Sequence, residues 1–393
     1  MPLIAAAIGY FTKLVAVEMM FRPIEFKGRR PYLGWQGIIP RYAGRMAAIA
    51  CDMLTAKLLD PQELFDRLDP ERMVQELEQP LTEAVREIAE EIAARTQPEL
   101  WASLPDAVKA RVLTQVKREA PRVIAEIMDQ VREDVEGIFD FKEMVVTNLI
   151  RDKETLNKMF RYAGRREFGF IVRFGAPSGF VIGLIQALAW ALFKEPMIMP
   201  IFGLFTGWLT DYTALKLVFV PKYPKRILGI TFQGLFFKHR DEFTDTYGDL
   251  VARQVVTPRN MIHAVLRGPT SDRLFAIIQR KLYDEMDGQI GLGRPLVVLA
   301  VGGTGYQQVK ELIAEMVLQR LPDTAQQLED YAEDALDIRN TVVQKMRQLS
   351  EDEFEQLLRP AFKQDEWKLI AVGAVLGFLV GELQVLLVEQ FGR

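Results

Sequence analysis

Two residues of opposite charge occupy equivalent places in two similar apolar segments of this chain. Lys13 lies in the segment that opens the sequence, and Asp211 lies in a second copy of it further along. A charge in hydrocarbon costs roughly 2.5–3.5 kcal/mol on insertion scales and usually finds a partner. We therefore expect Lys13 and Asp211 to form an intramembrane charge pair. Glu18 and Lys216 are a second pair of opposite charges at equivalent positions. Glu18 can pair with Arg22 on its own helix, and the Lys216 side chain can extend to the polar end of its segment.

Residues for nucleophilic, acid–base or metal chemistry are scarce. The chain has one cysteine and two histidines, so neither a cysteine-built metal site nor a Ser–His–Asp arrangement is indicated. His239, Asp241 and Glu242 stand together, but adjacent charges after an apolar turn are more typical of a solvated helix start than of a metal site. We expect no catalytic residues, no metal and no cofactor.

A glycine-rich stretch from Gly302 to Gly305 follows an apolar run and precedes a predicted helix. Such a loop can hold a phosphate at a helix N-terminus. The Gly-Lys-Ser/Thr ending of a P-loop and the full Rossmann spacing are both absent. A turn between helices is therefore the favoured interpretation.

A collar of basic residues follows each of the two similar segments. Its members are Arg22, Lys27, Arg29 and Arg30 in the first copy, and Lys222, Lys225 and Arg226 in the second. One interpretation is contact with anionic lipid headgroups, and the other is that the charges only set the orientation of the segments. The two do not exclude each other.

The residues above belong to two halves with the same order of features. Residues 9–23 and 207–221 share glycine, aromatic, threonine, alanine, phenylalanine and proline in register. The correspondence continues at an offset near 198 residues, up to Gln186 against Gln384. Long, ordered self-similarity of this kind predicts an internal duplication.

Each half opens and closes with an apolar segment near the roughly 20 residues that cross a hydrocarbon core. The segments are 3–21, 172–193, 197–220 and 369–388, and long polar helical regions fill 24–168 and 222–366. We predict an all-α membrane protein of two tandem repeats, 1–197 and 198–393. Each repeat would have two transmembrane helices and a long helical bundle region.

Three glycines recur four residues apart in each closing segment. They are Gly175, Gly179 and Gly183 in the first half, and Gly373, Gly377 and Gly381 in the second. This spacing places small residues on one helix face, where another helix can approach closely in lipid. We interpret them as helix-packing glycines. Packing within the chain suffices, and a homo-oligomer stays open.

The polar regions carry apolar residues at helical spacing. The stripes comprise Met73, Leu77, Leu81, Val85, Ile88 and Ile92; Val123, Ile127, Val131, Val135 and Ile138; and, in the second half, Val309, Leu312, Met316, Leu328, Ala332, Ala335, Val342 and Met346. A packed helical bundle is favoured over a lipid-facing groove. Alternating Val, Ile and Thr are scarce, so we expect almost no sheet.

Composition and charge narrow the class of protein. The 49% of hydrophobic and 26% of charged residues suit a chain that is part membrane and part soluble, and the net charge of −4 argues against a nucleic-acid binder. Basic residues flank the polar regions, whereas the turn between the second and third segments holds only Lys194 and Glu195. The positive-inside tendency then favours a multi-pass inner-membrane protein with cytoplasmic helical regions.

The opening motif Gly-aromatic-x-Thr-x3-Ala-x4-Phe-x-Pro resembles that of the bacterial membrane family catalogued as domain of unknown function 445. The Gln-Gly-Ile-Ile-Pro stretch at 36–40 and the glycine-rich C-terminal helix are also similar, and the resemblance covers essentially the whole chain. It implies a largely helical, membrane-anchored protein and carries over no catalytic residues. Lys13 and Asp211 depart from the family motif, which typically has asparagine directly after the threonine.

For function, the first expectation is a membrane scaffold or organising protein of the cell envelope. The alternative is a carrier or transporter of lipid or another amphiphile that uses the apolar helix faces. An enzyme is the least expected class. The expected partners are membrane lipids and a protein partner or second copy, without nucleic acid.

Overall fold

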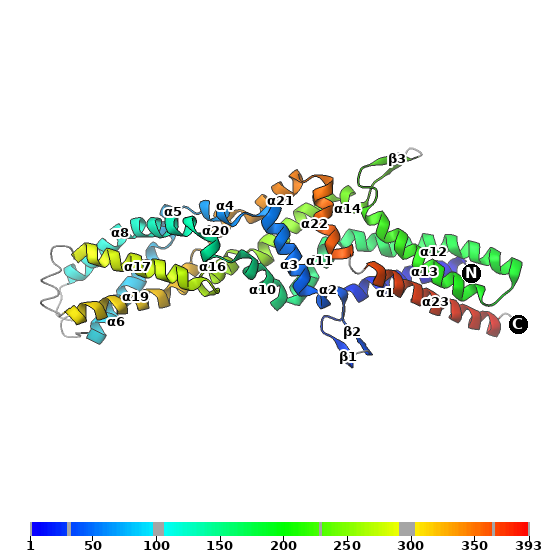
Figure 1. Ribbon diagram of the computed structural model, residues 1–393, viewed down its shortest axis with the longest axis horizontal. Helices are drawn as coiled ribbons and strands as arrows, with labels where there is room; N and C mark the ends of the chain where they lie inside the picture. The colour runs from blue at the N-terminus through cyan, green and yellow to red at the C-terminus, as the bar shows by residue number, and fades with distance from the viewer. Residues whose placement is uncertain are drawn as a thin grey trace. The chain divides into compact units, whose positions relative to one another are not determined.

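The protein is described here by a computed structural model that places residues 2–29, 33–96, 106–227, 230–290, 303–363 and 366–391. Within these ranges nearly every residue is α-helical, and the strands form only two separate two-stranded hairpins (Figure 1). The prediction of a largely helical chain with almost no sheet is therefore confirmed.

Packing divides the chain into two compact units. Unit 1 contains Met1–Leu54, Val146–Leu250 and Val342–Arg393, and unit 2 contains Thr55–Val145 and Val251–Thr341. Each unit thus combines residues from both predicted repeats, 1–197 and 198–393. The repeats themselves stay a prediction about the sequence.

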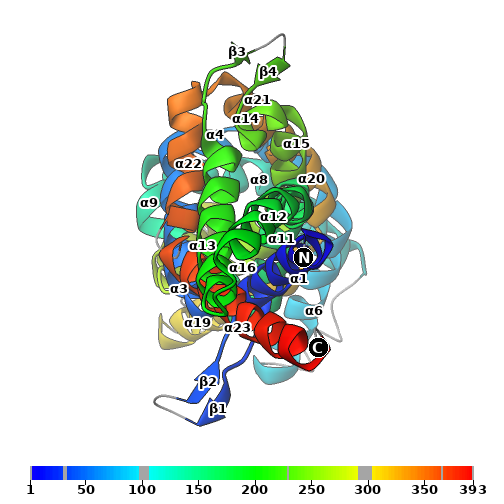
Figure 2. The same cartoon turned by 90° about the vertical axis from the view of Figure 1, so that its right-hand side faces the viewer.

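Four long helices dominate unit 1. They are α1 (Pro2–Phe21), α12 (Arg165–Phe193), α13 (Ile198–Phe219) and α23 (Glu366–Phe391). Helix α1 packs along α12, and α13 packs along α23, while α12 also contacts α13 and α1 contacts α23. Figures 1 and 2 show the four helices side by side.

The outward faces of these four helices carry large apolar side chains. Leu3, Phe11, Leu188, Ile201 and Leu379 are each more than half exposed. The buried positions of the four helices include glycines, polar residues and apolar residues such as Ile182 and Met199. A water-soluble bundle seldom exposes so many large apolar side chains, so the outward faces suit contact with lipid.

Three of the described helices are long and apolar enough to cross a membrane: α1, α12 and the part of α23 from Glu366 to Leu386. Helices α1, α12 and α23 contain the predicted segments 3–21, 172–193 and 369–388, and the last of these extends two residues beyond Leu386. Helix α13, which carries most of the predicted segment 197–220, is not among them. Its sequence includes Asp211 and three threonines, and its crossing of the membrane stays a prediction.

The rest of unit 1 consists of two hairpins and shorter helices. The hairpins pair β1 (Lys27–Arg29) with β2 (Leu33–Trp35), and β3 (Lys225–Ile227) with β4 (Ile230–Phe232). The helices are α2 (Ile38–Arg41), α3 (Ala43–Met53), α11 (Lys153–Ala163), α14 (Leu235–Lys238), α15 (Arg240–Leu250) and α22 (Glu351–Lys363). Helices α10 (Phe141–Arg151) and α21 (Ile338–Gln348) contain boundaries between the units.

The two hairpins are attached to their long helices in the same way. The carbonyl oxygen of Pro23 accepts a hydrogen bond from the Gly37 N–H at 2.9 Å, and that of Pro221 accepts one from the Gly234 N–H at 2.8 Å. Each contact closes the base of a hairpin, so β1–β2 follows α1 as β3–β4 follows α13.

Unit 2 is built from nine α-helices within the described residues. They are α4 (Pro61–Asp66), α5 (Pro70–Glu76), α6 (Glu78–Thr96), α8 (Asp106–Glu133), α9 (Val135–Ile138), α16 (Pro258–Arg267), α17 (Ser271–Ile290), α19 (Gly303–Gln326) and α20 (Glu329–Leu336). π-Helical turns occupy Leu54–Leu58 and Val251–Val255. Helices α4, α5 and α16 each begin at a proline, and the preceding Asp60, Asp69 or Thr257 side chain accepts a hydrogen bond from an N–H of the first turn.

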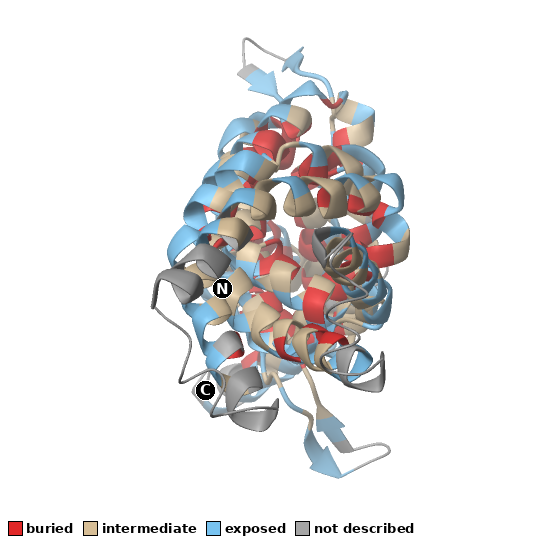
Figure 3. Cartoon of the chain, turned by 90° about the vertical axis from the view of Figure 1, so that its left-hand side faces the viewer, coloured by how far each residue is buried: buried red, intermediate tan, exposed pale blue. Residues whose placement is uncertain are grey.

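The four longest helices of unit 2 form a closed ring. Helix α6 contacts α8, α8 contacts α17, α17 contacts α19, and α19 contacts α6. Helices α5, α16 and α20 pack against the ring, where Leu77, Leu328 and Tyr331 are buried together. Figure 3 shows buried residues on the inward faces of the helices and exposed residues on the outward faces.

Candidate functional site

Lys13 of α1 and Asp211 of α13, the pair for which the swapped signs predict a contact, form an ion pair with side chains only 1% and 6% exposed. Lys13 Nζ also donates a hydrogen bond to Thr210 Oγ1 at 2.7 Å. The second carboxylate oxygen of Asp211, Oδ2, is buried without a hydrogen-bond partner in the described part of the chain. Removing one member of a buried pair typically costs about 3–5 kcal/mol, so this contact ties α1 to α13.

Glu18 and Lys216 are not brought together. Glu18 pairs with Arg22 on its own helix at 3.2 Å and with Arg161 at 2.8 Å. Lys216 is exposed, and its Nζ lies 3.5 Å from the Tyr212 hydroxyl. The two charges therefore lie at the polar surface of the helices, apart from the buried pair.

All six glycines singled out in the sequence lie where two long helices meet. A Cβ atom at Gly175 would overlap the carbonyl oxygen of Gly9, and one at Gly377 would overlap that of Gly203. The remaining contacts are Gly179 and Gly183 with α1, and Gly373 and Gly381 with α13. The glycines thus pack α12 on α1 and α23 on α13, within one chain.

The basic collar divides into two groups. Lys27, Arg29, Lys225 and Arg226 lie exposed on the strands β1 and β3. Arg22 pairs with Glu18, and Lys222 pairs with Asp352 at 2.6 Å and with Glu355. Arg30 lies outside the described residues. The exposed hairpin residues are therefore the better candidates for contact with anionic headgroups.

Unit 2 contains an elongated cavity of about 690 Å³ inside the helix ring. Ligand-binding pockets generally measure about 300–1,000 Å³. Along α8 the lining runs from Gln115 to Val131, which corresponds to roughly 24 Å of helix. Apolar side chains make up nearly all of the lining, and they include the predicted stripe residues Met73, Leu77, Leu81, Val85, Ile88, Val123, Ile127 and Val131.

Ion pairs across the seams hold the walls of this cavity. Between α8 and α17, Arg122 pairs with Glu285, and Lys281 pairs with Glu126 at 2.9 Å. Between α17 and α19, Lys310 pairs with Asp287 at 2.9 Å. Between α19 and α6, Arg320 lies 3.4 Å from both Glu87 and Glu91. These contacts fix the separation of the helices without filling the space between them.

The weaker candidates do not assemble into sites. Gly302 lies outside the described residues, and Gly303–Gly305 form the first turn of α19. Asp241 and Glu242 lie in the first turn of α15, next to His239, and Glu242 pairs with the Arg166 guanidinium at 2.7 Å. No group of three potential metal ligands occurs among the described residues.

Reasoning from the sequence missed the closed ring and its cavity. It identified the apolar stripes on both halves, but periodicity shows only that a face is covered. The available signal was their recurrence in both halves, because faces from the two halves together can enclose a space that neither encloses alone.

A family model described as a protein of unknown function, DUF445, matches residues 3–135. The predicted resemblance to the DUF445 family is confirmed over these residues, whereas its predicted extension over essentially the whole chain stays a prediction. No solved structure matches this chain significantly.

The curated relatives of this chain are named as membrane proteins. A UPF0754 membrane protein of Microcystis aeruginosa is 33% identical over 145 residues, which cover 35% of this chain and 34% of the relative. Relatives of the same name are 40% identical in Gloeothece citriformis and 42% in a Nostoc species, each over 67 residues and 16% of both chains. The matched stretches thus span about a third or less of these relatives. The names of these relatives and the apolar outward faces of unit 1 both indicate a membrane protein.

Proposed function

We propose that unit 2 binds the hydrocarbon chain of a lipid-like amphiphile. The cavity inside the helix ring carries this proposal. Its lining offers few hydrogen-bonding groups, so a ligand with a long apolar part fits it and a sugar or nucleotide does not.

The size of the cavity supports an occupant. A volume of about 690 Å³ lies within the range of ligand-binding pockets. Each CH₂ group of a ligand that enters this apolar space gains about 0.8 kcal/mol on leaving water.

Of the two roles expected from the sequence, the cavity favours the carrier of an amphiphile over the scaffold. The binding role needs no covalent chemistry, so we propose a non-catalytic protein. Membrane lipids are its proposed partners, and the exposed basic residues of β1 and β3 are its proposed contacts with anionic headgroups.

We further propose that the chain arose by internal duplication and lies in the inner membrane with unit 2 on the cytoplasmic side. The supporting observations are paired features, namely the α1–α12 and α13–α23 glycine contacts, the two hairpins and the two π-helical turns. The basic residues next to the long helices support the orientation.

The binding proposal is tested with purified full-length protein and a fluorescent fatty acid. Ala325 lines the cavity on α19, whereas the neighbouring Gln326 is exposed and does not line it. Ala325→Trp fills the space and is expected to lower affinity at least tenfold, and Gln326→Trp is expected to leave it unchanged. Equal binding by the wild type and Ala325→Trp would overturn the proposal, as would no saturable binding by the wild type.

A further inference from the structure

Polar residues line the inside of the four-helix group of unit 1. Among the described residues of α1, α12, α13 and α23, the buried polar side chains are Thr12, Lys13, Glu167, Gln186, Thr210, Asp211 and Gln384. Burying polar groups among membrane helices is unfavourable, and ionisable residues there generally mark a pathway or relay. The glycines alone are enough for the helices to pack closely, so packing does not account for these polar side chains.

These polar side chains extend across most of a membrane's thickness. Glu167 and Gln186 lie 19 residues apart on α12, which is roughly 28 Å along the helix. A hydrocarbon core measures about 30 Å. Lys13 packs against Gly175, which lies roughly 12 Å from Glu167 and 16 Å from Gln186 along α12. The Lys13–Asp211 pair therefore lies near the middle.

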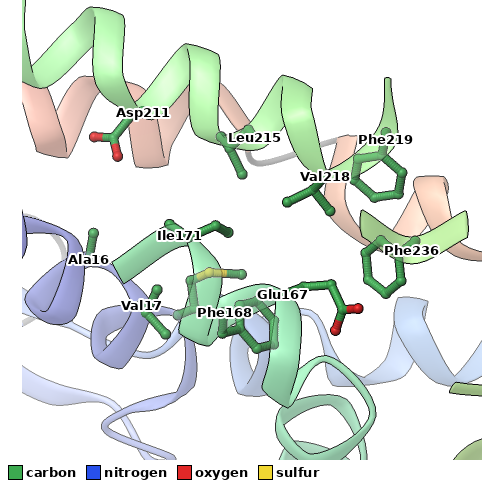
Figure 4. Close-up of a pocket in the computed structure, with 11 residues that line it drawn as sticks. Ala16, Val17, Glu167, Phe168, Ile171, Asp211, Leu215, Val218, Phe219 and Phe236 are labelled. Atoms are coloured by element: carbon green, nitrogen blue, oxygen red, sulfur yellow. The ribbon is translucent and has the colours of Figure 1, made fainter. Parts of the chain in front are cut away.

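A small cavity connects the pair with Glu167. Its volume is about 30 Å³, and its lining includes Glu167, Asp211 and apolar residues of α1, α12, α13 and α14. Figure 4 shows Asp211 and Glu167 at opposite ends of it. Since a water molecule needs about 10–15 Å³ of such volume, two waters fit. The carboxylates of Asp211 and Glu167 are the polar groups of the lining that can hold them, whereas the unpartnered Asp211 Oδ2 lies against Gly373 of α23.

A second cavity lies on the other side of the pair. It measures about 20 Å³ and is lined by Thr12, Thr206, Thr210, Gln186 and Gln384 together with small residues, so it has room and polar partners for one water. Gln186 Nε2 donates a hydrogen bond to Gln384 Oε1 at 3.1 Å. Gly381 packs on Met199 and Pro200 in the first turn of α13, so Gln384 lies at that end of the helix group.

We propose that the four long helices of unit 1 conduct protons along this internal polar line, with Lys13 and Asp211 as the central exchange pair. A proton enters at Glu167 and passes through cavity water to the Asp211 carboxylate. The Thr210 hydroxyl donates a hydrogen bond to the Thr206 carbonyl oxygen at 2.7 Å. In the relay it turns from that oxygen, releases its proton to water in the second cavity and accepts a proton from the ammonium group of Lys13. Asp211 then returns its proton to Lys13. One proton enters and one leaves, and both side chains regain their charges.

Other charged groups on the packed helices lie off this line. Arg173, Lys216 and Glu382 are exposed, and Glu18 pairs with Arg22 and Arg161 at the helix ends. Near the Glu167 end lies the exposed ion pair of Arg166 with Glu242.

His239 also belongs to the Glu167 end, because Arg166 and Glu242 act electrostatically on both Glu167 and His239. Burial lowers the pKa of His239, and the nearby cations Arg166 and Lys238 lower it further. Its ring is therefore mainly neutral at neutral pH, and its Nδ1 atom is buried without a hydrogen-bond partner in the described part of the chain. The Glu167 end of the internal polar line therefore lies near titratable side chains, where protons can enter.

The test uses full-length protein in liposomes that contain a pH-sensitive dye, with a potassium gradient and valinomycin to drive proton entry. Wild-type liposomes are expected to acidify faster than protein-free liposomes. Asp211→Asn and Glu167→Gln should each lower the protein-dependent rate at least tenfold. Lys216→Gln, on the same helix as Asp211 but exposed, should retain it.

Glu167→Gln keeps the test decisive if Asp211→Asn does not fold. Glu167 takes part in no ion pair within 4 Å among the described residues, and glutamine has nearly the same shape, so this variant should elute and unfold like the wild type. A wild-type rate equal to that of protein-free liposomes would overturn the proposal. An unchanged rate in folded Glu167→Gln would overturn it as well.

Discussion

Gly9 and Gly175 approach so closely that a Cβ atom on either one would overlap the carbonyl oxygen of the other. Gly203 and Gly377 have the same reciprocal relationship on α13 and α23. Small residues allow backbones to pack directly where lipid removes the hydrophobic drive for association. The two helix pairs therefore depend on the absence of side chains at these four positions.

Replacing one of these glycines should separate its helix pair. Gly377→Leu is expected to lower the thermal stability of the purified protein and its yield in the membrane, because the leucine must displace the Gly203 backbone. Gly169→Ala is the matched control, since nothing lies within 4 Å of its added Cβ. In a helix this change should be neutral or stabilising by up to about 1 kcal/mol. Equal stability of the two variants would contradict the close packing.

Exchanging the charges of Lys13 and Asp211 tests their pairing. Lys13→Asp alone and Asp211→Lys alone each place two like charges together and should cost about 3–5 kcal/mol, seen as poor accumulation in the membrane. The double variant restores opposite charges and should recover much of the yield. A double variant that accumulates no better than either single variant would exclude an energetic link between the two residues.

The stability of unit 1 should depend on pH through Glu355. Burial opposes ionisation of Glu355, but hydrogen bonds from Lys222 and Arg359 outweigh it, and the pKa of its carboxyl lies below its usual 4.5. A carboxyl with a lowered pKa in the folded state stabilises the protein above its unfolded-state pKa. That contribution is lost as the pH falls through the folded-state value.

Glu355→Gln should therefore destabilise the protein at pH 7 by roughly 1–3 kcal/mol, as expected for a hydrogen bond to a charged group. The difference from the wild type should shrink as the pH falls below about 4.5. Thermal unfolding of both proteins at several pH values measures this. A difference that stays constant over that range would show that the charge of Glu355 is not responsible.

Reporter fusions test the orientation. Fusions at residues 120 and 268, both in unit 2, should report the cytoplasmic side, and fusions at residue 195 and the C-terminus should report the opposite side. A fusion at 195 on the same side as 120 would show that α12 does not cross. Fusions at 195 and 268 on one side would show the same for α13.

Much of unit 1 could be predicted from the sequence because its chemistry is local. A lysine and an aspartate at equivalent positions of two apolar segments require partners at similar depth. Glycines four residues apart require a close neighbour. Neither pattern reveals the unpartnered Asp211 Oδ2 or the small cavities on either side of the pair, because these depend on the packing of several helices at once.

The cavity of unit 2 could not be predicted for a related reason. Leu77, Val123 and Ile127 were recognisable as members of apolar stripes, but the same stripe fits a filled core and an open one. The difference depends on how far apart the ring helices stand. That distance is set by contacts between the two halves, such as the ion pairs of Arg122 with Glu285 and of Arg320 with Glu87.

The central claim, that the ring of unit 2 holds a hydrocarbon chain, is tested most directly by photo-crosslinking. Full-length protein is illuminated with a fatty acid that carries a diazirine near its methyl end, and the modified residues are identified by mass spectrometry. The account predicts adducts on lining residues such as Ile124, Ile278 and Ile313, which excess unmodified fatty acid suppresses. Adducts confined to the outward faces of α1, α12 and α23, with none inside the ring, would contradict it.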